Sequence, residues 1–195
     1  MWDQRYSAQE YVYGKEPNDF LVSVASEWPP GRVLCLGEVE GRNAVWLAQR
    51  GFAVTAVDAS TIGLAKARRL AGERGVAIET IGADLAHFVF EPGHWDAVVS
   101  IFCHLPAAVR AALHRRVVAG LRSGGRFVLE AYTPRQLQLG TGGPPVLELM
   151  MDLQTLRAEL AGLDFAHAVE TEREIQEGQF HHGVGAVVQI LARKP

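Results

Sequence analysis

Residues 32–60 read RVLCLGEVEGRNAVWLAQRGFAVTAVDAS, and this stretch decides the expected fold. Residues 32–36 form an apolar run that is too short for a helix, which predicts a strand buried on both faces. Residues 37–41 then predict a tight turn, residues 43–50 a short helix, and residues 53–57 a second buried strand. The order β-turn-α-β is the first half of an α/β unit of the nucleotide-binding type.

The turn and the end of the second strand predict a ligand site. A glycine turn lets the backbone approach a ligand, and the helix that follows presents N–H groups without helical partners. Asp58 lies 21 positions after Gly37, where a carboxylate can accept hydrogen bonds from two ribose hydroxyls. The alternative is a purely structural βαβ unit.

The turn does not have the spacing G-x-G-x-x-G that is typical of dinucleotide sites. Glu38 and Glu40 lie between its two glycines, and their charges would repel a pyrophosphate. Acidic side chains there suit a cationic ligand without phosphate, such as the sulfonium of S-adenosylmethionine.

At this point the chain resembles the class I S-adenosylmethionine-dependent methyltransferases, in particular their small tellurite-resistance and thiopurine types. The string EGRNAVWLAQRGFAVTAVDAS, residues 40–60, carries most of the resemblance, which extends over nearly the whole chain. Two positions depart from the family pattern. Cys35 stands where the family usually has an acidic residue, and Val39 stands where it usually has glycine. Valine disfavours positive φ, at a cost of about 1–3 kcal/mol if the family's turn is kept, so these departures bear on cofactor affinity.

The resemblance implies that S-adenosylmethionine is the cofactor and S-adenosylhomocysteine the product. In the family, an Asp at the position of Asp84 holds the adenine amino group and the next residue, here Leu85, packs on the ring; alternatively, Asp84 caps local backbone. The expected cofactor residues are Gly37, Glu38, Val39, Gly41, Arg42, Asn43, Asp58, Ala59, Ser60, Asp84, Leu85 and Phe102.

The candidate acceptor residues are aromatic, imidazole or cationic. His104 follows the central strand expected at 95–102, so it is a candidate catalytic and substrate residue, with a structural role as the alternative. Tyr11 and Tyr132 are further catalytic candidates, and Tyr13 and Arg135 are substrate candidates. The tyrosines of the N-terminal segment could instead fix it to the core, and Arg135 could simply be solvated.

The remaining pattern predicts helices at 19–27, 60–74, 106–121 and 151–160, and strands at 76–81, 126–132, 165–176 and 183–193. We therefore expect a Rossmann-like seven-stranded methyltransferase sheet, with five parallel strands, a C-terminal antiparallel hairpin and helices on both faces. It forms a single domain, 1–195, whose residues 1–30 are an arm and helix covering the site. His181 and His182, at the hairpin turn, are expected to be solvated.

The composition sets further bounds on partners and compartment. Apolar residues make up 48% of the 195, the net charge is −3, and the sequence has no C-x-x-C spacing. We expect no metal, no nucleic-acid partner, no secretion signal, no membrane span, a cytoplasmic location, and a monomer or homodimer.

These features predict in-line methyl transfer from S-adenosylmethionine to a small-molecule acceptor. The first alternative is a methyltransferase-like cofactor-binding module with weakened catalysis, which Val39 and Cys35 suggest. The second is an NAD-linked oxidoreductase, which the turn and the terminal hairpin disfavour. A soft nucleophile would need no base, whereas an oxygen or nitrogen nucleophile would need one.

Overall fold

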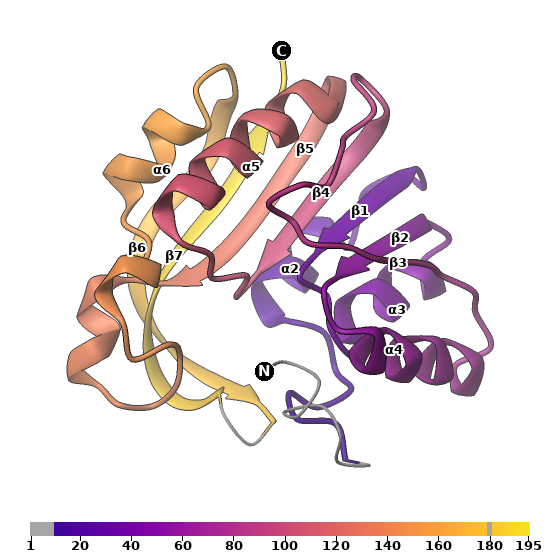
Figure 1. Ribbon diagram of the computed structural model, residues 1–195, viewed down its shortest axis with the longest axis horizontal. Helices are drawn as coiled ribbons and strands as arrows, with labels where there is room; N and C mark the ends of the chain where they lie inside the picture. Colours follow the sequence, from indigo (N-terminus) through magenta and orange to yellow (C-terminus); the bar gives the residue numbers. More distant parts are fainter. Residues whose placement is uncertain (1–9, 179–180) are drawn as a thin grey trace.

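A single mixed sheet organises the computed structural model, which describes residues 10–178 and 181–195 (Figure 1). Within these residues the sheet has seven strands in the order β3-β2-β1-β4-β5-β7-β6. The strands are β1 Arg32–Leu36, β2 Ala53–Asp58, β3 Glu79–Gly82, β4 Trp95–Ile101, β5 Leu121–Tyr132, β6 Asp164–Glu177 and β7 His181–Arg193.

Strands β1 to β5 are parallel, and β7 is antiparallel to both β5 and β6. The predicted five parallel strands and terminal hairpin are therefore confirmed. Strand β1 lies between β2 and β4, so the strand order reverses there, and a ligand site is expected at the carboxyl ends of β1 and β4.

Helices cover both faces of the sheet (Figure 1), since alternate residues of its central strands point to opposite sides. Leu34 of β1 packs in a cluster with residues of α5 and α6, whereas Val33 packs with residues of α2, α3 and α4. The helices are α2 Asp19–Ala25, α3 Arg42–Gln49, α4 Thr61–Glu73, α5 Ala107–Gly120 and α6 Leu153–Glu159, with short 3-10 turns η1 Pro134–Gln138 and η2 Leu147–Leu149.

Two strand boundaries differ from the predicted ones for identifiable reasons. Strand β3 begins at Glu79 and not at Val76, because the N–H of Val76 bonds to Ala71 at the end of α4. Strand β5 begins at Leu121, which pairs with Trp95 across a shift in register that the sequence did not reveal.

Candidate cofactor and acceptor site

The turn between β1 and α3 requires glycine at both of its ends. Gly37 has φ 61°, and a Cβ added there would lie 2.7 Å from Sγ of Cys103. Gly41 has φ 90°, and its added Cβ would lie 2.6 Å from Cβ of Ala67. The positive φ angles and the close neighbours together allow no side chain at either position.

Val39, in the middle of this turn, has φ 49° and so occupies the left-handed region. The turn keeps the geometry that favours glycine although valine is present. A β-branched residue at positive φ is strained. Cγ1 of Val39 lies near Gly63 of α4, where an added Cβ would be 3.0 Å away. Any side chain on Gly63 would therefore meet Val39.

Asp58, the last residue of β2, lies at the expected ribose-binding position, and the residue is 8% exposed. Its Oδ1 accepts the N–H of Ser60 at 2.7 Å and its Oδ2 accepts the N–H of Val39 at 3.2 Å. Ser60 caps α4 by accepting the N–H of Gly63, and Ala59 is exposed between them.

Glu38 caps the N-terminus of α3. Its Oε1 accepts the N–H groups of Asn43 and Ala44, both at 2.8 Å. Burial raises the pKa of the Glu38 carboxyl to about 7, although these hydrogen bonds and the nearby Arg42 oppose the rise. The carboxylate thus takes up helix N–H groups that were expected to face a ligand.

Glu40 fixes the N-terminal segment to the turn. Its Oε1 lies 2.5 Å from Nζ of Lys66, and its Oε2 accepts the N–H of Val12 at 2.8 Å. The side chains of Glu40 and Lys66 are only 3% and 7% exposed. The two acidic residues of the turn, Glu38 and Glu40, therefore stabilise the structure around the turn, in addition to any effect on a cationic ligand.

The other predicted adenine contacts lie after β3. Asp84 is exposed, and its Oδ1 accepts the N–H of Ala86 at 2.8 Å, the local capping that the sequence left open. Leu85 is 6% exposed and packs in the core cluster under α5. The geometry therefore favours a core role for Leu85 over the predicted ring contact.

Both ring nitrogens of His104 form hydrogen bonds with backbone groups of the protein. Nδ1 lies 2.8 Å from the carbonyl oxygen of Leu149, to which it donates, and Nε2 accepts the N–H of Tyr132 at 3.4 Å. Burial lowers the pKa of His104 to about 4. This geometry favours the structural alternative over the predicted role in catalysis.

An aromatic cluster lies at the carboxyl ends of β4 and β5. Phe102, which has φ 50°, lies 4.6 Å from the ring of Tyr132 and 4.7 Å from that of His181, measured between centroids. Tyr132 is fully buried, and its hydroxyl has no hydrogen-bond partner among the described residues. Burial, with Glu177 and Glu130 nearby, raises the pKa of Tyr132 far above its usual value, so it remains protonated.

The other three predicted acceptor residues, Tyr11, Tyr13 and Arg135, do not all lie together. Tyr11 donates to the carbonyl of Lys66 at 3.1 Å, which favours its alternative role of fixing the arm to α4. Tyr13 joins the aromatic cluster, with its ring centroid 4.7 Å from that of His181. Arg135 is 62% exposed and pairs with Glu172, so the geometry does not support it as an anion holder.

The prediction that His181 is solvated was wrong. His181 is 8% exposed and contacts Tyr13, Phe102 and Tyr132, whereas His182 is exposed as predicted. The sequence placed the hairpin turn over these histidines, but β7 already begins at His181. Its side chain therefore packs in the aromatic cluster with Tyr13, Phe102 and Tyr132.

A buried polar network underlies the cluster and was not predicted. Asn18 Nδ2 donates to Glu130 at 2.6 Å and to Glu177 at 2.7 Å, while Arg173 pairs with both carboxylates. Arg42 pairs with Glu177 at 2.5 Å. Asn43 Oδ1 accepts the N–H of Asn18 at 2.9 Å, so the side chains of the predicted cofactor residues 42–43 hold the network and the arm.

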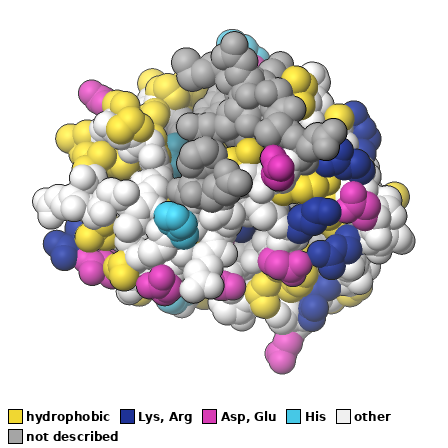
Figure 2. All heavy atoms as spheres, turned by 90° about the horizontal axis from the view of Figure 1, so that it is seen from below, with side chains coloured by type: hydrophobic (Ala, Val, Ile, Leu, Met, Phe, Trp, Pro, Cys, Tyr) yellow, Lys and Arg dark blue, Asp and Glu magenta, His cyan; other side chains and the backbone are white. Residues whose placement is uncertain are grey.

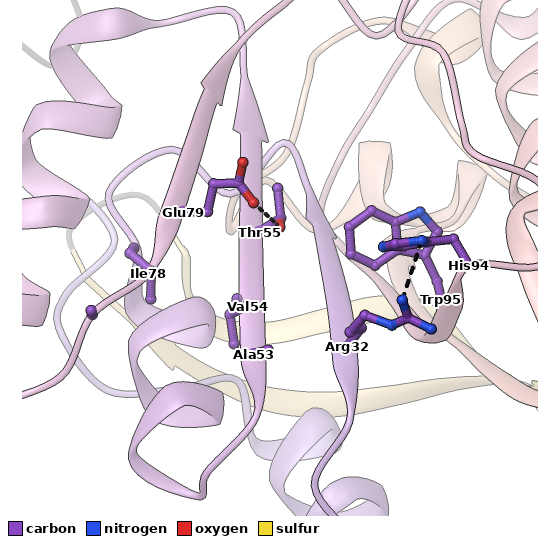
Figure 3. A pocket seen from close by; sticks show the side chains of 9 residues that line it. Arg32, Ala53, Val54, Thr55, Ile78, Glu79, His94 and Trp95 are labelled. Atoms are coloured by element: carbon purple, nitrogen blue, oxygen red, sulfur yellow. Dashed lines mark hydrogen bonds between the residues drawn. The ribbon is translucent and has the colours of Figure 1, made fainter.

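A hollow of about 500 Å³ lies at the opposite, amino edge of the sheet (Figure 3). Its lining includes Arg32 and Ala53, the first residues of β1 and β2, so it is separate from the predicted cofactor crevice. Within residues 10–178 and 181–195, no helix could span a bilayer and no group of three or more His, Cys, Asp or Glu could hold a metal ion.

The residues at the carboxyl edge fit S-adenosylmethionine in chemistry. The Asp58 carboxylate, at the carboxyl end of β2, suits ribose hydroxyls. Cys35 is buried beneath the turn, and burial holds the pKa of its thiol well above the usual value, so it adds no charge there.

Comparison with known proteins agrees with this fit. Residues 33–125 match the family model described as a methyltransferase domain. The curated 2-heptyl-1-hydroxyquinolin-4(1H)-one methyltransferase of Mycobacteroides abscessus is 26% identical over 122 residues, covering 60% of this chain and 54% of that protein. The match thus spans about half the length of the curated relative.

Two solved structures share the fold. TehB from Haemophilus influenzae is similar with a TM-score of 0.75 and 19% identity, covering 100% of this chain and 66% of that one. The N-methyltransferase NodS from Bradyrhizobium japonicum, in complex with S-adenosyl-l-homocysteine, is similar with a TM-score of 0.67 and 16% identity, covering 98% and 86%. Residues 33–125 thus resemble a methyltransferase domain, and the chain as a whole shares the fold of TehB and NodS.

Proposed function

We propose that the protein transfers a methyl group from S-adenosylmethionine to a small-molecule acceptor by in-line displacement. The observation that carries this proposal is the position of Asp58, which ends β2 and holds the turn beside the point where the strand order reverses. When bound, the cofactor would supply a methyl group activated on a sulfonium. The chain's own part is to align the acceptor and to exclude water.

Several features support a small acceptor. Phe102, Tyr13 and Tyr132 form an apolar wall at the carboxyl edge, which suits a ring or an alkyl group. Lys and Arg side chains gather on one side of the molecule seen from this edge, with Asp and Glu among them (Figure 2). Lys15 pairs with Glu73 and Arg74 with Glu16, so this side is a poor match for a nucleic acid.

The curated relative is named for an N-hydroxyquinolone acceptor, so a planar hydroxylated heterocycle is a sensible first substrate to test here. The weaker alternative, a cofactor-binding module without catalysis, is supported by the strained φ of Val39. It predicts cofactor binding without turnover.

Release of S-adenosylhomocysteine, detected by mass spectrometry, tests the proposal across a panel of acceptors. The panel comprises 2-heptyl-1-hydroxyquinolin-4(1H)-one, thiols, phenols, iodide, tellurite, selenite and small carboxylates. Turnover with at least one of them is expected, and the matched control is the Asp58→Ala variant. Binding of the cofactor with no turnover on any acceptor would favour the binding module.

A further inference from the structure

The β6–β7 hairpin places an imidazole beside a carboxylate. Glu177 ends β6 and His181 begins β7, and the two residues lie directly opposite each other in the antiparallel pair. Opposite residues of neighbouring strands share a face, so their side chains meet. Nδ1 of His181 is 4.0 Å from Oε2 of Glu177, and the two residues are only 8% and 5% exposed.

Glu177 supplies a fixed negative charge at this position. Burial alone would raise the pKa of its carboxyl, but His181, Arg42 and Arg173 outweigh burial and lower it to about 2. A carboxylate on the Nδ1 side favours the tautomer that carries its proton on Nδ1, and it stabilises the imidazolium once a second proton is taken up.

The imidazole also lies where an acceptor would meet the cofactor. Its centroid is 4.7 Å from Phe102, the residue that directly follows β4 at the reversal of strand order, and 5.3 Å from Tyr132. Tyr132 presents the buried hydroxyl that has no partner among the described residues, which is the condition expected beside a polar ligand atom.

We propose that His181 is the general base of this site and that Glu177 is its positioning residue. The inference rests on the methyl transfer proposed above, and it assigns the acceptor to the class whose nucleophile carries a proton: O–H, N–H or S–H. The bond from nucleophile to methyl carbon forms as the carbon–sulfur bond breaks, and sulfur keeps the electron pair. The nucleophile's proton moves to Nε2 of His181 and then to water.

His104 does not fill this role, because both of its nitrogens are engaged by Leu149 and Tyr132. The titratable groups next to His181 are Glu177, Tyr13, Tyr132 and His104. Arg42 and Arg173 pair with Glu177, and Glu130 pairs with Arg173.

The test compares His181→Gln with His182→Gln, the exposed neighbour on the same strand, and each variant is first checked by thermal melting. Initial rates of S-adenosylhomocysteine formation are measured against pH with three protic acceptors, 2-heptyl-1-hydroxyquinolin-4(1H)-one, benzenethiol and phenol. Iodide serves as the acceptor without a proton.

We expect His181→Gln to lower kcat/KM for phenol by about 10²–10⁴-fold, the usual contribution of a general base, and to remove the rising limb of its pH profile. The loss should be smaller for the more acidic benzenethiol and absent for iodide, and added imidazole should restore part of the phenol rate. The His182→Gln variant should match the parent protein.

Equal losses on phenol and iodide, or a phenol rate equal to that of His182→Gln, would overturn the role of His181. If the parent protein binds the cofactor yet methylates neither these four acceptors nor any other member of the panel above, the proposed function fails and this inference falls with it. If it methylates iodide alone, methyl transfer stands but the assignment of a protic acceptor is overturned.

Discussion

The backbone N–H of Val39 donates a hydrogen bond of 3.2 Å to Oδ2 of Asp58, joining the strained residue of the turn to the end of β2. The same carboxylate lies at the position expected for ribose contact. Strain at Val39 and the binding of a cofactor are therefore coupled through one side chain.

We expect Val39→Gly to tighten binding of S-adenosylmethionine. The positive φ of Val39 destabilises the folded parent by about 1–3 kcal/mol, and glycine removes this strain. Glycine also gives the unfolded chain more freedom, which lowers the stability of the variant by about 0.4–1 kcal/mol. The variant should therefore be no less stable than the parent. The control is Val39→Ala, which keeps a Cβ at positive φ and should gain less. A dissociation constant for the Gly variant that equals or exceeds the parent's, measured by calorimetry, would sink the strain argument.

Replacing Glu38 by Gln should stabilise the protein at high pH. The folded-state pKa of Glu38 is raised from 4.5 to about 7, so the folded state binds more protons than the unfolded state between these values. The parent's stability then falls as pH rises through this window, by about 1–3 kcal/mol. Gln can still accept from Asn43 and Ala44 without titrating.

Urea denaturation at pH 5 and pH 8 measures this effect. The difference in free energy of unfolding between the Gln variant and the parent should be small at pH 5 and should grow toward pH 8. A difference that is the same at both values would show that burial does not raise the pKa of Glu38.

The buried pair Glu40–Lys66 should show strong coupling. Glu40→Leu leaves the Lys66 ammonium buried without its partner carboxylate, which should cost about 3–5 kcal/mol. The double variant Glu40→Leu, Lys66→Met leaves no uncompensated charge and should cost less than either single change. Lys15→Met breaks an exposed pair as a control and should change the free energy of unfolding little. Additive effects of the two buried changes would refute coupling.

His104 should make stability fall in mild acid. Its folded-state pKa is lowered to about 4 from 6.5, so the unfolded state binds more protons between these values, and stability is lost as pH falls through this window. The loss should be about 1–3 kcal/mol. His104→Asn, whose amide can still donate to Leu149, should flatten this part of the profile, and an unchanged slope would mean that His104 is protonated in the folded state.

The fold could be predicted because the patterns that indicate it lie in short stretches of the sequence. Buried strands, the glycine turn and the spacing to Asp58 all lie within residues 32–60, and the terminal hairpin follows from two long alternating runs. The sequence left open whether the turn keeps the geometry that favours glycine, and the positive φ of Val39 shows that it does.

The acceptor side of the site was harder to predict, because it is built from contacts between distant segments. Asn18, Glu130 and Glu177 meet only after the arm, β5 and β6 come together, and no local pattern marks any of them. The predicted strand began at residue 183, whereas β7 begins two residues earlier, at His181. This difference placed His181 in a turn in the prediction, although its side chain is buried in the structure.

Titration calorimetry of S-adenosylhomocysteine, with parent protein and Asp58→Ala side by side, tests the central claim most directly. The parent should bind one molecule per chain and should give no comparable heat with NAD. Asp58→Ala, with its fold checked by circular dichroism, should bind more weakly by about 1–3 kcal/mol, the usual range for losing a charged hydrogen-bond acceptor. No binding by the parent, or an equal dissociation constant in the variant, would contradict the claim that the carboxyl edge of this sheet holds the cofactor through Asp58.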